Sequence, residues 1–293
     1  MESATMLPTP DTSHVSYNRV YEPAEDSFLL LDTLSAPSET AFLSSRFAPA
    51  TTTTTPSPSP SGAATAAHPL LVLEVGPGSG VVLAFLTAHA ARIFGTRAVL
   101  AAGADVNRFA CAATAATAAK AVSAARGDAT AGLFLDAVQG DLAGAFRPAA
   151  VDVLVFNPPY VPTPSLPGHS PDPTATTTTD SSSSDAEAAG RSREPTFAEE
   201  SHLLELAYAG GRDGMETTDR LLASLPDVLS PRGCAYVLLC QQNRPEEVKA
   251  RIRDWGPAWG AETVGTSGKT AGWEKLQIVR VWRRTSSEDA EGR

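Results

Sequence analysis

The tetrapeptide Asn157-Pro158-Pro159-Tyr160 follows an apolar run, residues 151–156, that predicts a buried strand. The two prolines have no N–H, so this corner offers mainly hydrogen-bond acceptors. The Asn157 side-chain oxygen can accept one N–H of a planar –NH2 group, the Pro158 carbonyl can accept the other, and the Tyr160 ring can stack on its plane. An amide or aromatic amine held in this way can act as a nucleophile. The alternative is an ordinary turn after a strand.

A glycine-rich loop lies upstream, where residues 70–75 predict another buried strand that leads into Gly76, Gly78 and Gly80. Glycines let the backbone turn tightly and approach a nucleotide-like ligand. Dinucleotide-binding loops have one more residue before the third glycine. The carboxylate of Glu74 would also repel a pyrophosphate, whereas it would attract an ammonium group. A ligand that carries an amine therefore fits this loop better than a dinucleotide.

Two further segments, Tyr21-Glu-Pro-Ala-Glu-Asp-Ser27 and Ala209-Gly-Gly-Arg-Asp-Gly214, extend the pattern. In this order, the four segments resemble those of the HemK-type protein-(glutamine-N5) methyltransferases, in the eukaryotic and archaeal branch that methylates a release factor. The resemblance covers nearly the whole chain except two low-complexity stretches. Asn-Pro-Pro-Tyr is shared with adenine-N6 methyltransferases and marks only the wider class, whereas the two further segments point to the branch.

Polar side chains lie at or just after the ends of four of the predicted strands, and in an open parallel sheet these strand ends form the ligand site. They are Glu74, Asp105, Asp141 and Asn157. Taken singly, each carboxylate would more often be a helix cap or a solvated loop acid; the ordered series of four strand ends favours a ligand site. Asp105 is placed to accept the two hydroxyls of a ribose and Asp141 to accept an exocyclic adenine amine, while Glu74 would face an ammonium group.

The resemblance implies S-adenosylmethionine as the cofactor and assigns roles to residues of each motif. The expected cofactor-binding residues are Ser27, Glu74, Gly76, Gly78, Gly80, Asp105, Asp141, Leu142 and Asn157. The expected catalytic residues are Asn157, Pro158 and Tyr160, and the expected substrate-binding residues are Asn157, Pro158, Pro159 and Tyr160. Ser27 could also be simply a residue of the first helical turn.

The order of elements predicts an α/β fold. Strands are expected at residues 70–75, 98–105, 133–138, 151–156, 234–240, 261–266 and 274–281. Helices are expected at residues 23–34, 79–94, 108–125, 199–208, 216–229 and 245–255. This alternation predicts a mostly parallel sheet of seven strands with helices on both faces, and the short turn between the last two strands requires one antiparallel strand. The resemblance implies the same Rossmann-like fold of class I methyltransferases.

Composition predicts a single domain spanning residues 1–293, interrupted by two inserts. Residues 36–69 and 163–197 are rich in Pro, Ser, Thr and Ala, and we expect both to be disordered surface loops. Residues 285–293 are expected to form a disordered tail. Without the inserts about 220 residues remain, a usual size for one α/β domain.

The chain carries 33 acidic and 23 basic residues, a formal net charge of −10. Non-specific nucleic-acid binding needs a basic surface, so nucleic acid is disfavoured as a partner. The 3 cysteines and 5 histidines have no metal-ligand spacing, which predicts buried thiols in a reducing compartment and no metal site. We find no signal peptide or membrane-spanning run, and expect a cytoplasmic location, with the nucleus as the alternative.

The leading functional hypothesis is methylation of the glutamine amide in the Gly-Gly-Gln motif of the eukaryotic class I release factor. An adenine-N6 amine of DNA or RNA is one alternative and a histone lysine another; a non-catalytic scaffold is disfavoured because the cofactor motifs are intact. The third strand, Leu133–Val138, is expected at the sheet edge with no guarding lysine or proline. The resemblance implies that a small zinc-binding activator subunit pairs with this strand; homodimerisation is the alternative.

Overall fold

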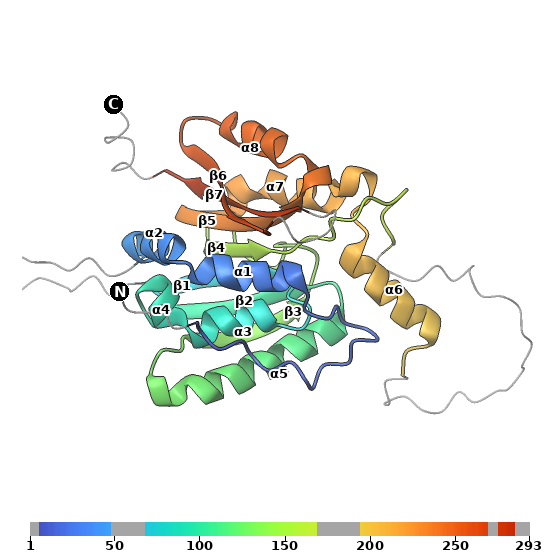
Figure 1. Cartoon of the computed structure of the whole chain (residues 1–293), viewed down its shortest axis with the longest axis horizontal. Helices are drawn as coiled ribbons and strands as arrows, with labels where there is room; N and C mark the ends of the chain where they lie inside the picture. The colour runs from blue at the N-terminus through green and yellow to red at the C-terminus, as the bar shows by residue number, and fades with distance from the viewer. Residues whose placement is uncertain (1–5, 48–67, 169–193, 269–274, 285–293) are drawn as a thin grey trace, which may run out of the picture.

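The computed structural model describes residues 6–47, 68–168, 194–268 and 275–284, which form one seven-stranded sheet with helices on both faces (Figure 1). The strands are β1 (Leu70–Val75), β2 (Val99–Asp105), β3 (Leu133–Gln139), β4 (Val151–Phe156), β5 (Leu229–Cys240), β6 (Trp259–Thr266) and β7 (Leu276–Arg283). Their order is β3-β2-β1-β4-β5-β7-β6, and β7 runs antiparallel to both of its neighbours. The predicted fold and the edge position of β3 are confirmed.

The helices form two layers. The α-helices are α1 (Glu25–Ser35), α2 (Pro37–Phe47), α3 (Val81–Ala88), α4 (Ala90–Phe94), α5 (Arg108–Ala124), α6 (Phe197–Tyr208), α7 (Glu216–Val228) and α8 (Pro245–Arg253). Short 3-10 turns are η1 (Ala125–Asp128), η3 (Arg212–Gly214) and η4 (Gln241–Asn243). Helices α1 to α4 pack on one core and α7 and α8 on the other, while α6 lies apart from the sheet at one end of the molecule (Figure 1).

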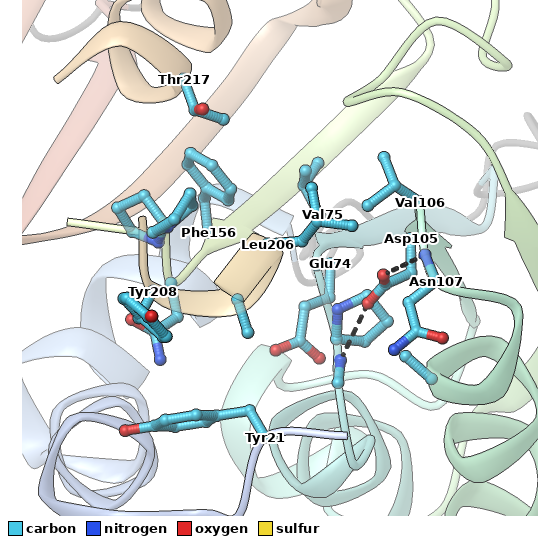
Figure 2. Close-up of a pocket in the computed structure, with 18 of the residues that line it drawn as sticks. Tyr21, Glu74, Val75, Asp105, Val106, Asn107, Phe156, Leu206, Tyr208 and Thr217 are labelled. Atoms are coloured by element: carbon cyan, nitrogen blue, oxygen red, sulfur yellow. Dashed lines mark hydrogen bonds between the residues drawn. The ribbon is translucent and has the colours of Figure 1, made fainter. Parts of the chain in front are cut away.

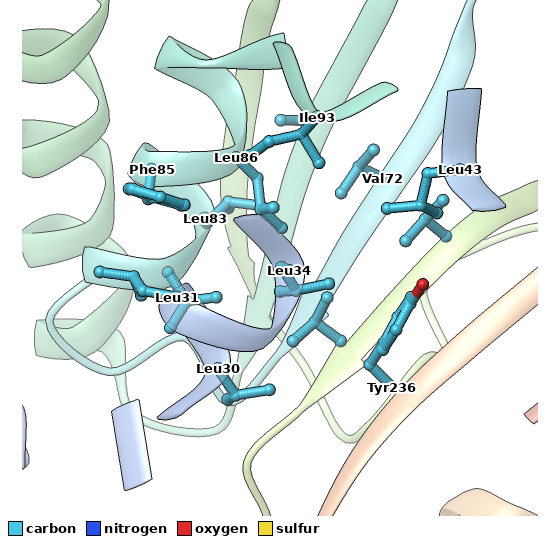
Figure 3. Packing of buried hydrophobic residues seen from close by; sticks show 14 of the residues in the cluster. Leu30, Leu31, Leu34, Leu43, Val72, Leu83, Phe85, Leu86, Ile93 and Tyr236 are labelled. Carbon is cyan, nitrogen blue, oxygen red and sulfur yellow. The ribbon is translucent and has the colours of Figure 1, made fainter. Parts of the chain in front are cut away.

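The two cores follow from the alternation of side chains along each strand. Val72 faces the layer of α1 to α4, in the same cluster as leucines such as Leu30 and Leu83 (Figure 3). Val153 belongs to this cluster too. Their neighbours, such as Leu154, point to the other face and meet α7 and α8. Because both faces of the central strands are covered, these strands are nearly continuous apolar runs in the sequence. The polar residues at the carboxyl ends of these strands are therefore attached to a rigid, buried backbone.

The first expected insert, residues 36–69, begins with an ordered helix and not with a disordered loop. Residues 37–47 form α2, in which Glu39, Leu43 and Phe47 are buried. The Glu39 carboxylate forms an ion pair with Arg280 at 2.8 Å and accepts a hydrogen bond from the Tyr236 hydroxyl at 2.8 Å. The prediction of disorder came from the high Pro/Ser/Thr content averaged over the whole segment, which gives little weight to these few core residues. Residues 48–67 lie outside the described part of the chain.

The second expected insert, residues 163–197, is also ordered at both ends. The Gly211 N–H donates to the Thr163 side chain at 3.0 Å, and Thr196 caps α6 in a reciprocal pair with Glu199. The capping side chain satisfies a free N–H of the first helical turn, which explains why α6 starts there. Residues 169–193 and the expected tail, 285–293, fall outside the described residues.

Within the described residues, no helix is both long and apolar enough to cross a membrane.

Candidate active site

A cavity of about 380 Å³ opens at the carboxyl ends of β1, β2 and β4. Most of the residues expected to bind ligands line it. They are Ser27, Glu74, Gly76, Gly78, Asp105, Asp141, Leu142, Asn157, Pro158, Pro159 and Tyr160. Helix α6 contributes Leu203, Leu206 and Tyr208 to the wall, although the sequence predicted no role for it. A cavity of this volume is within the range of small-molecule and cofactor sites.

Two buried carboxylates, Glu74 and Asp105, lie next to each other at one side of this cavity, with Tyr21 across from them (Figure 2). Burial raises the pKa of Glu74 well above its ordinary value, and the charge of Asp105 adds to the rise. One oxygen of Glu74, Oε2, is buried and has no hydrogen-bond partner among the described residues. A buried acceptor left unpaired costs free energy, so this site favours a ligand with N–H donors and positive charge.

The Asp105 carboxylate is held by backbone N–H groups on both sides. Oδ1 accepts from Asn107 N at 2.8 Å and Oδ2 accepts from Gly78 N at 3.2 Å, the two contacts drawn in Figure 2. Burial raises the pKa of Asp105 to about 6, although these two hydrogen bonds oppose the rise. The carboxylate is therefore fixed in direction, and each of its oxygens can still accept a hydroxyl.

Gly80 differs from the prediction because it does not line the cavity. It precedes α3 with φ +79°, and a Cβ atom there would lie 2.5 Å from the Thr114 Cα of α5. The glycine is needed for the close approach of the loop to α5, whose Thr117 hydroxyl donates to Ser79 O of the loop at 2.7 Å. Gly80 shapes the loop, while Gly76 and Gly78 face the ligand space.

The Asn157 side chain is held in one orientation at the end of β4. Its nitrogen, Nδ2, donates to Asp26 Oδ2 at 3.0 Å. Its oxygen, Oδ1, is buried and has no hydrogen-bond partner in the described part of the chain. The sequence predicted an acceptor at this position, and the structure leaves the oxygen free to accept. An unpaired buried carbonyl favours a ligand that brings an N–H.

The backbone after Asn157 is fixed by Asn243 of η4. Its Nδ2 donates to Tyr160 O at 3.2 Å and to Asp213 O at 3.1 Å, while its Oδ1 accepts from Cys240 N at 2.8 Å. One buried side chain thus joins the Asn-Pro-Pro-Tyr corner, the Ala209–Gly214 segment and the end of β5. This contact holds the Ala209–Gly214 segment against the corner.

Asp141 and Leu142 lie at the cavity, after β3, as predicted. The Asp141 carboxylate forms an ion pair with Arg220 of α7, whose side chain also lines the cavity. Both side chains are 46% exposed, so solvent screens the pair and its contribution to stability is small. Within the described residues, no group of three or more His, Cys, Asp and Glu side chains is arranged to hold a metal ion.

Comparison with known proteins decides the family. No family model matches the chain. The chain is 33% identical to mouse "Methyltransferase HEMK2" over 286 residues, which cover 95% of this chain and 98% of the mouse protein. The chain belongs to the HEMK2 family of methyltransferases. It is also 29% identical over 281 residues to the "eRF1 methyltransferase catalytic subunit mtq2" of Schizosaccharomyces pombe, covering 95% and 96% of the two chains.

Among solved structures, the chain is similar to one from the E. cuniculi Mtq2–Trm112 complex, described as responsible for methylation of the eRF1 translation termination factor. The TM-score is 0.46 at 21% identity, and the match covers 91% of this chain and 99% of the other. The resemblance drawn from the four sequence segments is thus confirmed at the level of the family by the mouse relative.

Sequence reasoning missed three side chains of this site: Asp26, Arg220 and Asn243. Asp26 lies in the Tyr21–Ser27 segment, of which only Ser27 was expected to bind the cofactor. Asn243 comes shortly before Pro245, where a helix was expected to begin, and no sequence motif marks it. A buried acid next to an expected ligand residue is the one signal that could have identified Asp26.

Proposed function

We propose that this chain methylates the glutamine side-chain amide in the Gly-Gly-Gln motif of the eukaryotic class I release factor, with S-adenosylmethionine as the methyl donor. The observation that carries the proposal is the Asn157 amide, whose nitrogen is engaged by Asp26 and whose buried oxygen is left to accept an N–H. The name of the S. pombe relative, an eRF1 methyltransferase subunit, supports the choice of substrate.

The residues of the cavity fit S-adenosylmethionine. The unpaired Oε2 of Glu74 suits the ammonium of its methionine portion, and Asp105 suits the ribose hydroxyls. Gly76, Gly78 and Ser27 complete the binding surface on that side, and Asp141 with Leu142 the adenine side. When bound, this cofactor supplies a methyl group already activated on a sulfonium, so the chain needs no metal and no covalent intermediate.

The remaining contribution of the protein is alignment of the nucleophile. The Asn157 oxygen and the Pro158 carbonyl would accept the two N–H groups of the substrate amide, and the Tyr160 ring would cover its plane. Acceptors fixed in this way favour a pyramidal nitrogen over the planar ground state, which lowers the barrier to transfer. Asn243 holds the corner through its hydrogen bond to Tyr160 O, which helps to fix the positions of the Asn157 and Pro158 acceptors.

The proposed substrate is tested by incubating the protein, with its activator subunit, with labelled S-adenosylmethionine and one of three acceptors: the release factor, duplex DNA or histone H4. We expect label on the release factor, at the glutamine of Gly-Gly-Gln, and none on a release factor in which that glutamine is replaced. Label on DNA or histone alone would contradict the proposal.

Asp105 should give cofactor affinity a characteristic pH dependence. Because the pKa of Asp105 is about 6 rather than 3.8, its carboxylate is present above pH 6 and is lost as the pH falls through 6. Calorimetric affinity for S-adenosylmethionine should therefore rise between about pH 5 and 7. Asp105→Asn should weaken binding at pH 8 by roughly tenfold or more, the value of a lost charge-assisted hydrogen bond, and should flatten the profile. An unchanged affinity would mean that the ribose lies elsewhere.

The Asp105 carboxylate gives folding stability a pH dependence opposite to that of cofactor affinity. Its folded-state pKa lies above its ordinary value, so the favourable contribution of Asp105 to folding is present at low pH and is lost as the pH rises through about 6. Thermal unfolding of the ligand-free protein should therefore show wild type losing stability relative to Asp105→Asn as the pH rises from about 4 to about 6.

A partner is proposed for the free edge of the sheet. In β3, Leu133 is 57% exposed, Leu135 49% and Val138 37%, on a strand whose outer edge is unpaired among the described residues. An apolar open edge promotes aggregation unless it is covered. We infer that the small zinc-binding activator subunit implied by the family resemblance covers it by adding a strand. The zinc then belongs to that subunit.

Expression alone should give poorly soluble protein, and co-expression with this subunit should give a soluble 1:1 complex by light scattering. The double variant Leu133→Lys/Leu135→Lys should prevent complex formation, because two exposed apolar side chains that the subunit would cover become charges. Phe197→Lys is the control, since Phe197 is 84% exposed and belongs to α6, which lies apart from the sheet (Figure 1). A fully active, stable monomer without the subunit would contradict the proposal.

A further inference from the structure

Asp26 connects the two halves of the site from the first turn of α1. The residue is only 3% exposed. Oδ1 accepts from the Ser27 backbone N–H at 2.6 Å and from the Ser27 hydroxyl at 3.2 Å. Oδ2 accepts from Asn157 Nδ2 at 3.0 Å. Both oxygens are therefore engaged by donors, and one of these donors is the side chain that meets the substrate amide.

A primary amide can present either its oxygen or its nitrogen, because the two ends have nearly the same shape. A carboxylate removes this ambiguity because it can only accept hydrogen bonds. Facing Asp26, the Asn157 amide must direct its Nδ2 toward the carboxylate, and its Oδ1 then points away from it. The opposite orientation would set Oδ1 against Oδ2 of Asp26, where two buried acceptors repel each other.

We propose that Asp26 is a positioning residue that fixes the orientation of the Asn157 amide, so that the acceptor Oδ1 and not the donor Nδ2 is presented to the substrate. This inference rests on the proposed function. The unpaired, buried state of Oδ1 is its second observation, because an amide free to rotate would place its oxygen where some donor could reach it.

The orientation decides which end of a substrate amide enters. An Asn157 acceptor pairs with the –NH2 of a glutamine, which places the nitrogen in the corner. A flipped Asn157 would present a donor, which pairs with the glutamine carbonyl and would place the oxygen where the nitrogen must react. Asp26 thus selects the reacting atom through its hydrogen bond to Asn157.

The matching of donors and acceptors can be tested by exchanging the two side chains. In Asp26→Asn, the new side-chain oxygen still accepts from the Ser27 N–H, so the new –NH2 faces Asn157. The Asn157 amide then rotates to direct its Oδ1 toward position 26 and its Nδ2 toward the substrate. In Asn157→Asp, two carboxylates face each other. In the double variant Asp26→Asn/Asn157→Asp, the amide at position 26 donates to one oxygen of the carboxylate at position 157. The other oxygen of that carboxylate remains as the acceptor for the substrate.

Turnover is measured on the release factor with the activator subunit present, together with affinity for S-adenosylmethionine and thermal unfolding. We expect each single variant to lose roughly 10²-fold in kcat, the value of one preorganised hydrogen-bonding group, with cofactor affinity changed by less than about threefold because the Ser27 contacts persist. The double variant should recover at least about tenfold over either single one. Glu25→Gln, an exposed acid of the same helical turn, is the control and should keep wild-type turnover.

A readout that needs no substrate separates this inference from the proposed function. The Asn157 side-chain –NH2 hydrogens, observed by NMR in labelled protein, should exchange slowly with solvent in wild type and fast in Asp26→Asn. Slow exchange in both proteins would overturn the inference whatever the substrate proves to be. Wild-type kcat in Asp26→Asn, or a double variant no more active than the single variants, would also overturn the inference. A loss confined to cofactor affinity would overturn it too, because Asp26 would then act only on the position of Ser27.

Discussion

Asn157→Ala is expected to remove most turnover while leaving cofactor affinity nearly intact. The change deletes the only acceptor oxygen of the side chain, Oδ1, which is the buried atom left without a partner at the Asn-Pro-Pro-Tyr corner. Removing one preorganised group of this kind typically costs about 10²–10³ in kcat. The groups on the cofactor side, Glu74 and Asp105, are untouched. We expect kcat on the release factor to fall by at least about a hundredfold, with a calorimetric Kd close to wild type.

The control for this substitution is Asn18→Ala, which makes the same truncation at an exposed asparagine outside the cavity. Its turnover and melting temperature should match those of wild type. If Asn157→Ala retained turnover within a few-fold of wild type, the corner would not be the amine site. If it lost cofactor affinity in proportion to kcat, Asn157 would serve binding and not catalysis.

The strands that carry the site could be predicted from the sequence because they are buried on both faces. Residues 70–75 and 151–156 are predominantly apolar runs, each with a single acid, Glu74 and Asp152, and they match β1 and β4 to the residue. Since parallel strands bring their carboxyl ends to one edge, the sequence alone predicts that Glu74, Asp105 and Asn157 lie together.

The break in the expected helix 79–94 could not be predicted. The chain forms α3 and α4 with a junction at His89. Two carbonyls at this junction accept from distant groups: Thr87 O from Gly132 N at 2.8 Å and Ala88 O from the Thr130 hydroxyl at 2.8 Å. These donors replace the helical ones, and they come from a loop that follows α5. Local periodicity contains no information on such contacts.

The same reason explains the side chains that were missed in the site. Asp26 and Asn157 are 131 residues apart, and Asn243 and Tyr160 are 83 apart. Each bond depends on where a loop places a short polar side chain, not on a hydrophobic pattern. The ligand-facing groups could thus be predicted from strand ends, whereas the residues that orient those groups required the structure.

Gly214→Ala is expected to displace the Asn-Pro-Pro-Tyr corner at the Tyr160 carbonyl and so to lower turnover. Gly214 has φ +68°, and a Cβ atom there would lie 2.0 Å from Tyr160 O and 2.8 Å from Asn243 Nδ2. The added methyl group must push the Tyr160 carbonyl away and break its bond with Asn243. A misplacement of about 1 Å at a catalytic group can cost on the order of 10² in rate. We therefore expect a kcat loss of about a hundredfold, with a lower melting temperature.

The two causes of this effect can be separated by matched variants. Gly256→Ala also places an alanine at positive φ, +129°, but nothing lies within 4 Å of its Cβ position. It should cost stability, by about 1–2 kcal/mol of backbone strain, without loss of turnover. Asn243→Ala removes the bond to Tyr160 O without strain in the glycine turn, and should lower kcat in folded protein. If Gly214→Ala and Asn243→Ala both kept wild-type kcat, the position of the Tyr160 carbonyl would not matter for catalysis, and the acceptors of the corner would have to be set by Asn157 and Pro158 alone.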